Sequence, residues 1–188
     1  YPKSHFVRLS EVSLRSLIYL YQLNTMPVHP LDYTIQSDVF STEELSAIFD
    51  EKARIARWLS FEAALAASQA ELGIIPKEAA AEINKQAKLD NLDLDFIRGE
   101  YTKSRNSLIP VLKGLRKACR NKAGEFVHYG ATTQDVLDTG HILEIKQTLT
   151  ILYRDLRRLK ICLLDMAGRY RDTPMAGRTH SQQALPIT

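Results

Sequence analysis

Residues 142–170 read ILEIKQTLTILYRDLRRLKICLLDMAGRY, and apolar side chains recur in this stretch alternately three and four positions apart. The series consists of Ile142, Ile145, Leu149, Leu152, Leu156, Leu159, Leu163, Met166 and Tyr170. Four heptads of this spacing predict a long bundle helix, which we expect to run unbroken from Thr133 to Tyr170. Gly140 and Gly168 are its expected weak points, because glycine costs roughly 1 kcal/mol relative to alanine inside a helix.

Additional apolar residues widen this stripe beyond what one neighbouring helix covers. They are Leu143, Ile151, Ile161 and Leu164. The rest of the chain is too short to cover the whole face, so we expect helices from other subunits to contribute. No segment shows a convincing strand pair. The predicted fold class is therefore all-α, an N-terminal helical domain followed by the start of a long-helix bundle that is incomplete in this chain.

Helical patterns also precede the long helix. Ser41 and Glu44 fit a capping box, while Gly73 and Pro76 fit a helix end followed by a break. The expected helices are residues 41–72, 77–88 and 108–121, and residues 90–106 read as irregular or weakly helical. We expect three parts: an extension or disordered tail at residues 1–25, a helical domain at 26–131, and the truncated start of the bundle at 132–188.

The composition excludes several classes of protein. Hydrophobic residues make up 45% and charged residues 25% of the 188 positions, as in ordinary soluble globular domains. The net charge of +3 is scattered along the chain, which favours small anionic ligands over nucleic acid. No apolar run approaches the roughly 20 residues that span a bilayer, so no membrane partner is expected. Cys119 and Cys162 lack metal-ligand spacing, which favours a reduced, cytoplasmic protein without a metal site.

Polar residues crowd the start of the long helix, where residues 125–140 read EFVHYGATTQDVLDTG. Thr132 and Asp135 fit a capping box, and Gly130 supplies the preceding bend. The same helix N-terminus, with unpaired backbone N–H groups and threonine hydroxyls, is equally suited to bind a carboxylate or phosphate. The stretch alone does not decide between these two interpretations.

A second polar cluster follows the long helix, where residues 177–188 read GRTHSQQALPIT. A helix over residues 133–170 would be roughly 55 Å long at about 1.5 Å per residue. The ten residues from Tyr170 to His180 reach at most about 34 Å when extended, so His128 and His180 cannot meet within one subunit. Either the two clusters serve separate purposes, or antiparallel helices from different subunits bring them into a shared site.

The runs VHYGATTQDVLDTG and GRTHSQQALPIT resemble, in order and spacing, the first two signature regions of the fumarase/aspartase superfamily of lyases. The likeness extends from about His29 to Thr188. Within the superfamily the chain is most similar to the branch that holds adenylosuccinate lyase and 3-carboxy-cis,cis-muconate cycloisomerase. Adenylosuccinate lyases typically place a histidine where this chain has Arg105, Asn106 and Ser107. That difference favours the cycloisomerase pattern, with adenylosuccinate lyase as the alternative.

The resemblance implies a homotetramer in which each active site is built from three subunits. It also implies a cofactor-free reaction that removes a proton beside a carboxylate and expels a group from the adjacent carbon, or the reverse. His180 and His128 are then the candidate catalytic residues, with a purely structural role as the alternative for His128. The candidate substrate-binding residues are Thr132, Thr133, Gln134, Asp135, Arg105, Asn106, Thr179 and Gln182.

These residue types suit such chemistry. Fixed hydrogen-bond donors aimed at the carboxylate stabilise the charge that builds up on it, and a helix N-terminus with Thr132, Thr133 and Gln134 can supply them. An imidazole such as that of His180 donates or accepts a proton near neutral pH, and Thr179 and Gln182 would hold the substrate beside it.

The third signature of the superfamily, a mobile Gly-Ser-Ser-x-Met-Pro loop that resembles the source of the catalytic base, does not occur in these 188 residues. We therefore expect the chain to be the N-terminal part of a lyase and to be inactive alone. A non-catalytic helical scaffold derived from such a lyase is the rival hypothesis. The histidine-containing second motif argues against it, because a scaffold has no evident use for that cluster.

Overall fold

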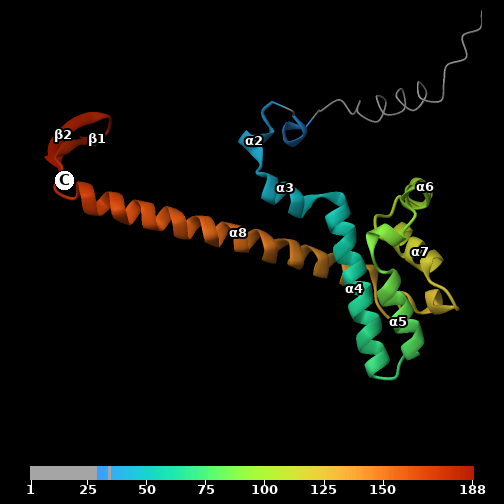
Figure 1. Ribbon diagram of the computed structural model, residues 1–188. Helices are drawn as coiled ribbons and strands as arrows, with labels where there is room; N and C mark the ends of the chain where they lie inside the picture. The colour runs from blue at the N-terminus through green and yellow to red at the C-terminus, as the bar shows by residue number, and fades with distance from the viewer. Residues whose placement is uncertain (1–28, 34) are drawn as a thin grey trace, which may run out of the picture. The chain divides into compact units, whose positions relative to one another are not determined.

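The computed structural model describes residues 29–33 and 35–188 (Figure 1). The tail predicted at residues 1–25 lies outside the described residues. The described part of the chain divides into two compact units between Ser46 and Ala47, inside helix α3 (Glu43–Phe49). In the first unit, a short 3-10 helix η1 (Pro30–Asp32) precedes helix α2 (Ser37–Phe40).

The second unit contains nearly all of the helical structure. Its helices are α4 (Glu51–Glu71), α5 (Lys77–Gln86), α6 (Leu94–Ser104), α7 (Ile109–Ala118) and α8 (Thr133–Tyr170), with 3-10 helices η2 (Leu89–Asn91) and η3 (Ala123–Phe126) between them. Two strands, β1 (Met175–Thr179) and β2 (Gln182–Ile187), follow α8. The all-α class is confirmed, with this small hairpin as the exception among the described residues.

The single helix predicted over residues 41–72 is two helices, because Asp50 interrupts it. The Asp50 carboxylate accepts the backbone N–H groups of Lys52 (2.9 Å) and Ala53 (3.2 Å), which starts α4 anew. The predicted capping box at Ser41 is also wrong. The Thr42 hydroxyl accepts the Leu45 N–H at 3.3 Å and therefore caps α3.

Helix α4 ends where the sequence indicates. Gly73 has a φ of +71°, and its N–H donates to the Ala70 carbonyl (3.2 Å) while the Ile74 N–H donates to the Gln69 carbonyl (2.8 Å). These two bonds form the helix-terminating pattern that favours glycine in the left-handed conformation. The chain then turns into α5, which packs against α4.

Residues 94–104 form a regular helix, α6, although the sequence predicted an irregular or weakly helical segment. The Asp93 carboxylate starts the helix by accepting the Phe96 N–H at 3.0 Å. Ile97 anchors it, since its side chain is buried and lies against Gly114 of α7. Helix α7 ends at Ala118, earlier than expected, because Cys119 already has an extended backbone.

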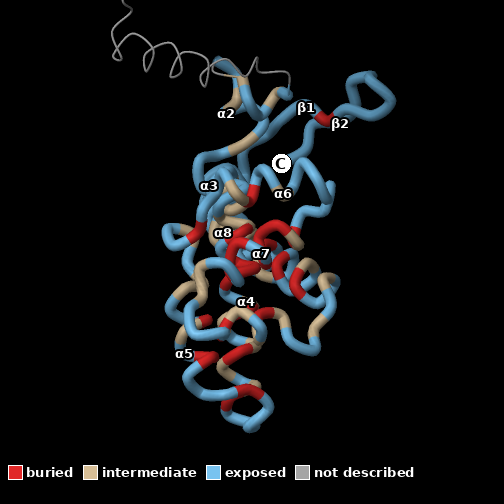
Figure 2. The backbone as a smooth tube through the Cα atoms, turned by 90° about the vertical axis from the view of Figure 1, so that its right-hand side faces the viewer, coloured by how far each residue is buried: buried red, intermediate tan, exposed pale blue. Residues whose placement is uncertain are grey.

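The hydrophobic core of this unit lies among α4, α5, α7 and the first turns of α8 (Figure 2). Its most buried side chains are Leu59, Ile83, Leu108, Leu115, Val111, Val127 and Val136. The apolar stripe of α4 thus becomes the centre of the domain, and the loop carrying His128 is fixed to it through Val127.

Helix α8 spans Thr133–Tyr170, as predicted from its heptads and from the cap at Thr132. The Asp135 carboxylate accepts the Thr132 N–H at 3.0 Å. Only Val136, Gly140 and Glu144 of this helix are buried, and they lie in its first part. The apolar series beyond Glu144 is exposed in the described residues, so its coverage by other subunits stays a prediction.

Charged side chains join α8 to α4 next to this buried part. The Glu144 carboxylate, 3% exposed, accepts Arg54 Nε at 2.9 Å and Arg57 Nη1 at 3.1 Å. Arg57 also donates to the Gln147 side chain (3.2 Å) and to the backbone carbonyl of Ile48. One buried cluster of charged and polar groups thereby fixes the angle at which α8 leaves α4.

The prediction that no strands pair is wrong for residues 175–187. Strands β1 and β2 pair antiparallel, with Thr179 opposite Gln182, and His180 and Ser181 form the turn with φ angles of +46° and +62°. All of these residues except Gly177 are exposed, so no alternation of buried and exposed positions marks the strands in the sequence.

The first prediction concerns the glycines of α8. A Cβ at Gly140 would lie 2.9 Å from Nε1 and 3.0 Å from Cδ1 of Trp58, a buried side chain, so Gly140 permits close packing and is not simply a weak point. Gly140→Ala should therefore destabilise the chain, because overpacking costs about 1–3 kcal/mol against a helix gain of roughly 1 kcal/mol.

Gly168→Ala is the matched control, since a Cβ there meets nothing within 4 Å in the described chain. It should raise the free energy of unfolding by up to about 1 kcal/mol. Urea unfolding followed by circular dichroism compares the two variants. Equal gains at both positions would contradict the packing of Gly140 against Trp58.

Candidate functional site

The first candidate group lies at the N-terminus of α8. Thr132, Gln134 and Asp135 are exposed, and Thr133 is half-buried. The first backbone N–H groups of a helix have no acceptor within the helix, and the positive end of the helix dipole lies there. Asp135 is engaged by the Thr132 backbone, and the Gln134 side chain donates to Asp138 at 2.6 Å. The Asp135 N–H donates to the Thr132 carbonyl at 3.1 Å, so the Thr133 hydroxyl and the N–H groups of Thr133 and Gln134 are the donors best placed for an anion.

His128 lies in the loop just before this helix and is held by a residue that the sequence did not single out. Its Nδ1 is 2.7 Å from Oε1 of Glu62, on α4. Glu62 is 2% exposed, and burial raises the pKa of its carboxyl, although the hydrogen bond and charge of His128 act in the opposite direction. The signal available in the sequence was an acid inside the apolar stripe of α4, between Leu59 and Ala66.

The backbone around His128 is also specific. His128 and Gly130 have φ angles of +64° and +69°, in the left-handed region. The Gln69 side chain, two helical turns beyond Glu62 on α4, donates to the Tyr129 carbonyl at 2.7 Å. Two side chains of α4 thus hold two consecutive residues of the loop that leads into α8.

Arg105 and Asn106 lie at the junction of α6 and α7. Arg105, with a φ of +52°, terminates α6, and the Oδ1 of Asn106 accepts the N–H groups of Leu108 (3.0 Å) and Ile109 (2.9 Å). Asn106 therefore has a structural task as the cap of α7. That task accounts for an asparagine here without reference to substrate.

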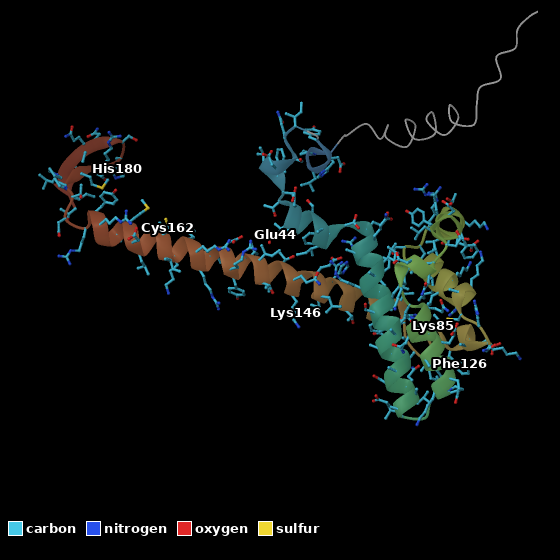
Figure 3. The ribbon with its side chains drawn as sticks, viewed as in Figure 1. Glu44, Lys85, Phe126, Lys146, Cys162 and His180 are labelled. Atoms are coloured by element: carbon cyan, nitrogen blue, oxygen red, sulfur yellow. The ribbon has the colours of Figure 1, made fainter. Side chains whose placement is uncertain are left out.

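The second candidate group, Thr179, His180 and Gln182, lies at the tip of the β1–β2 hairpin, and all three residues are exposed. Figure 3 shows His180 at the opposite end of α8 from Phe126, which precedes the His128 loop. The 38 residues of α8 separate the two groups by roughly 55 Å, at about 1.5 Å per residue. Within one chain the structure therefore gives two separate polar groups.

In the described part of the chain, no cluster of three or more His, Cys, Asp or Glu side chains is placed to hold a metal ion. Among the described helices, none is long and apolar enough to cross a membrane.

Comparison with known proteins defines the class of this fold. A family model described as lyase matches residues 39–188, so the chain belongs to this family of lyases. The similarity to adenylosuccinate and fumarate lyases places it in the fumarase/aspartase superfamily, as its two motifs indicated.

Three relatives illustrate the match. The N-acetyl-S-(2-succino)cysteine lyase of Enterococcus italicus is 45% identical over 163 residues, covering 87% of this chain and 36% of that protein. The adenylosuccinate lyase of Methanocaldococcus jannaschii is 39% identical over 163 residues, covering 87% and 34%. The crystal structure of 3-carboxy-cis,cis-muconate lactonizing enzyme from Pseudomonas putida has a TM-score of 0.76 at 33% identity, covering 82% and 36%. The chain thus spans about a third of the length of the curated relatives named here.

The second prediction tests the role of Asn106. Asn106→Ala should lower the free energy of unfolding by about 1 kcal/mol, because two backbone N–H groups of α7 lose their acceptor. Asn106→Asp retains an oxygen in the same place and should be close to wild type. Thermal unfolding distinguishes them, and equal losses in both variants would show that Asn106 is not a cap.

Proposed function

We propose that this chain supplies the carboxylate-binding part of a lyase that catalyses elimination or addition beside a carboxylate without a cofactor. The observation that carries the proposal is the start of α8, where Thr133 lies at a helix N-terminus that follows closely, along the chain, a histidine held by a buried acid. Membership of the lyase family supports it. The roles proposed for this chain are binding, orientation and proton transfer to or from substrate, and the catalytic base that begins the elimination is not assigned to it.

The chemistry follows from where charge develops. When a base removes the proton from the carbon beside a carboxylate, the electron pair spreads onto the carboxylate oxygens. Fixed donors there stabilise the intermediate more than the substrate, and this difference lowers the barrier. The electron pair then forms the C=C bond as the bond to the leaving group breaks. The leaving group departs with the bonding pair and takes up a proton, which an imidazole can donate.

We propose that the substrate is a small molecule carrying a succinyl group on sulfur or nitrogen, so that elimination yields fumarate and a thiol or amine. Of the relatives described above, the two with the higher identities are named for N-acetyl-S-(2-succino)cysteine and adenylosuccinate. The cycloisomerase reaction that the sequence favoured is the alternative. That preference rested on Arg105, Asn106 and Ser107, which stand where adenylosuccinate lyases typically place a histidine, and the capping bonds of Asn106 give that asparagine a structural explanation.

The third prediction tests this choice in a full-length lyase that contains the chain. N-acetyl-S-(2-succino)cysteine, adenylosuccinate and 3-carboxy-cis,cis-muconate are assayed side by side by ultraviolet absorbance. We expect release of fumarate from a succinylated substrate, and a fall of about 10²–10³-fold in kcat for Thr133→Ala, the loss typical of one missing oxyanion donor. Turnover of the muconate alone would favour the cycloisomerase, and no turnover of any substrate would favour the scaffold.

We further propose that the active site is shared, with the α8 N-terminus of one subunit facing His180 of another. Support comes from the length of α8, which keeps the two groups apart within one chain, and from the exposed apolar series on α8. Burying that series against other copies would remove a large apolar surface from water. A homotetramer is the assembly that we expect.

The fourth prediction follows from sharing. His180→Ala and Thr133→Ala should each reduce kcat about 100-fold or more in the full-length enzyme. When the two inactive variants are mixed and allowed to exchange subunits, part of the activity should return, because some sites then combine two intact groups. If exchange is demonstrated by mass spectrometry and no activity returns, the shared-site proposal is wrong.

A further inference from the structure

Glu62 is a carboxylate placed where the fold otherwise calls for an apolar side chain. It lies on the core-facing side of α4, with Leu59 (1% exposed) and Ala66 (3% exposed) one turn away on either side. Its Oε1 meets His128 Nδ1, whereas its Oε2 is buried without a hydrogen-bond partner among the described residues. An acid whose second oxygen is unpaired stabilises a fold less than a well-packed apolar residue does. Glu62 therefore requires an explanation other than stability.

The neighbours of Glu62 and His128 leave the imidazole with one anchor. Burial raises the pKa of Glu62, and the positive charge of Arg116, on α7, acts to lower it. The Arg116 side chain donates its hydrogen bond to the carbonyl of Val127, the residue before His128, at 3.2 Å. Gln69, also on α4, donates to the main chain of Tyr129 and not to a side chain. Among the described residues, the hydrogen bond recorded for the ring of His128 is thus the one from Nδ1 to Glu62.

We propose that Glu62 is a positioning residue that holds His128 by Nδ1 and so presents Nε2 as the nitrogen that exchanges a proton with substrate at the start of α8. This inference rests on the function proposed above. A carboxylate only accepts hydrogen bonds, so the proton of the neutral ring lies on Nδ1 and Nε2 carries the free lone pair. When Nε2 takes a proton from solvent, the resulting positive charge lies beside the Glu62 carboxylate, which stabilises it. Giving that proton to the leaving group, as its bond to carbon breaks, restores the neutral ring.

The position of the ring proton can be measured without any substrate. In the chain labelled with ¹⁵N-histidine, the His128 signals, assigned by their loss in His128→Gln, should report a neutral ring protonated at Nδ1. Glu62→Leu should move the proton to Nε2, because the acceptor at Nδ1 is gone. Gln69→Leu is the matched control, since it removes a contact to the next residue and should leave the imidazole signals in place. A ring protonated at Nε2 in the unaltered chain, or unchanged in Glu62→Leu, would overturn the proposal.

Turnover separates positioning from a purely structural role. In the full-length enzyme, Glu62→Leu should lower kcat about tenfold or more while KM changes little, and its unfolding temperature should not fall. Glu62→Gln keeps the shape but not the charge, so it should also lower kcat, and it serves if the leucine variant does not fold. If kcat per folded molecule is unchanged in both variants, the role proposed for Glu62 is wrong. The proposed function of the enzyme would not be affected by that result. If the unaltered enzyme turns over none of the substrates, the proposed function fails, and the NMR measurement still decides how His128 is held.

Discussion

The buried pairing of Glu144 with Arg54 and Arg57 is the constraint on which the second unit of this protein depends. It joins the only long helices of the described chain, α4 and α8, at the point where α8 passes from the core into solvent. Burying the charges of Glu144 and Arg57 has a substantial desolvation cost, which good geometry and further hydrogen bonds offset. Hydrogen bonds are directional, so they fix one angle between α4 and α8 more strictly than apolar packing does.

That angle matters for the candidate site, because α4 also holds the loop that precedes α8. Glu62, Gln69 and Arg57 occupy successive levels of α4 and bind, respectively, an imidazole, a backbone carbonyl and the carboxylate of Glu144. Helix α4 therefore holds the chain both before the N-terminus of α8 and at Glu144 beyond it. A rigid element beneath a polar loop is the arrangement that keeps donors fixed while charge develops on a substrate.

Much of this architecture was predictable from local sequence. The bounds of α8 follow from a sustained heptad and a Thr132–Asp135 cap. The polar residues at the start of α8 are consecutive in the sequence, so their grouping could be predicted without knowing the fold. The interruption at Asp50 and the helix at residues 94–104 were missed, because single acidic caps are common in sequences and decide boundaries only when the fold supports them. The hairpin was missed because its exposed residues show no alternation, and Glu62 was missed because its partner lies 66 positions away.

Helix α8 is packed against the rest of the chain at its start and exposed along most of its length. Its first three turns are packed against Trp58 and bound to the arginines of α4, whereas residues 145–170 include none that is buried in the described chain. Beyond the bond from Arg57 to Gln147, the helix is supported by its own hydrogen bonds and by surface pairs such as Asp155 with Arg158 and Asp165 with Arg169. Such a segment is marginally stable in water. Its backbone amides would open and exchange with solvent far more readily than those near Glu144 until another surface covers the apolar face, so quaternary contacts and local folding of this segment become one equilibrium.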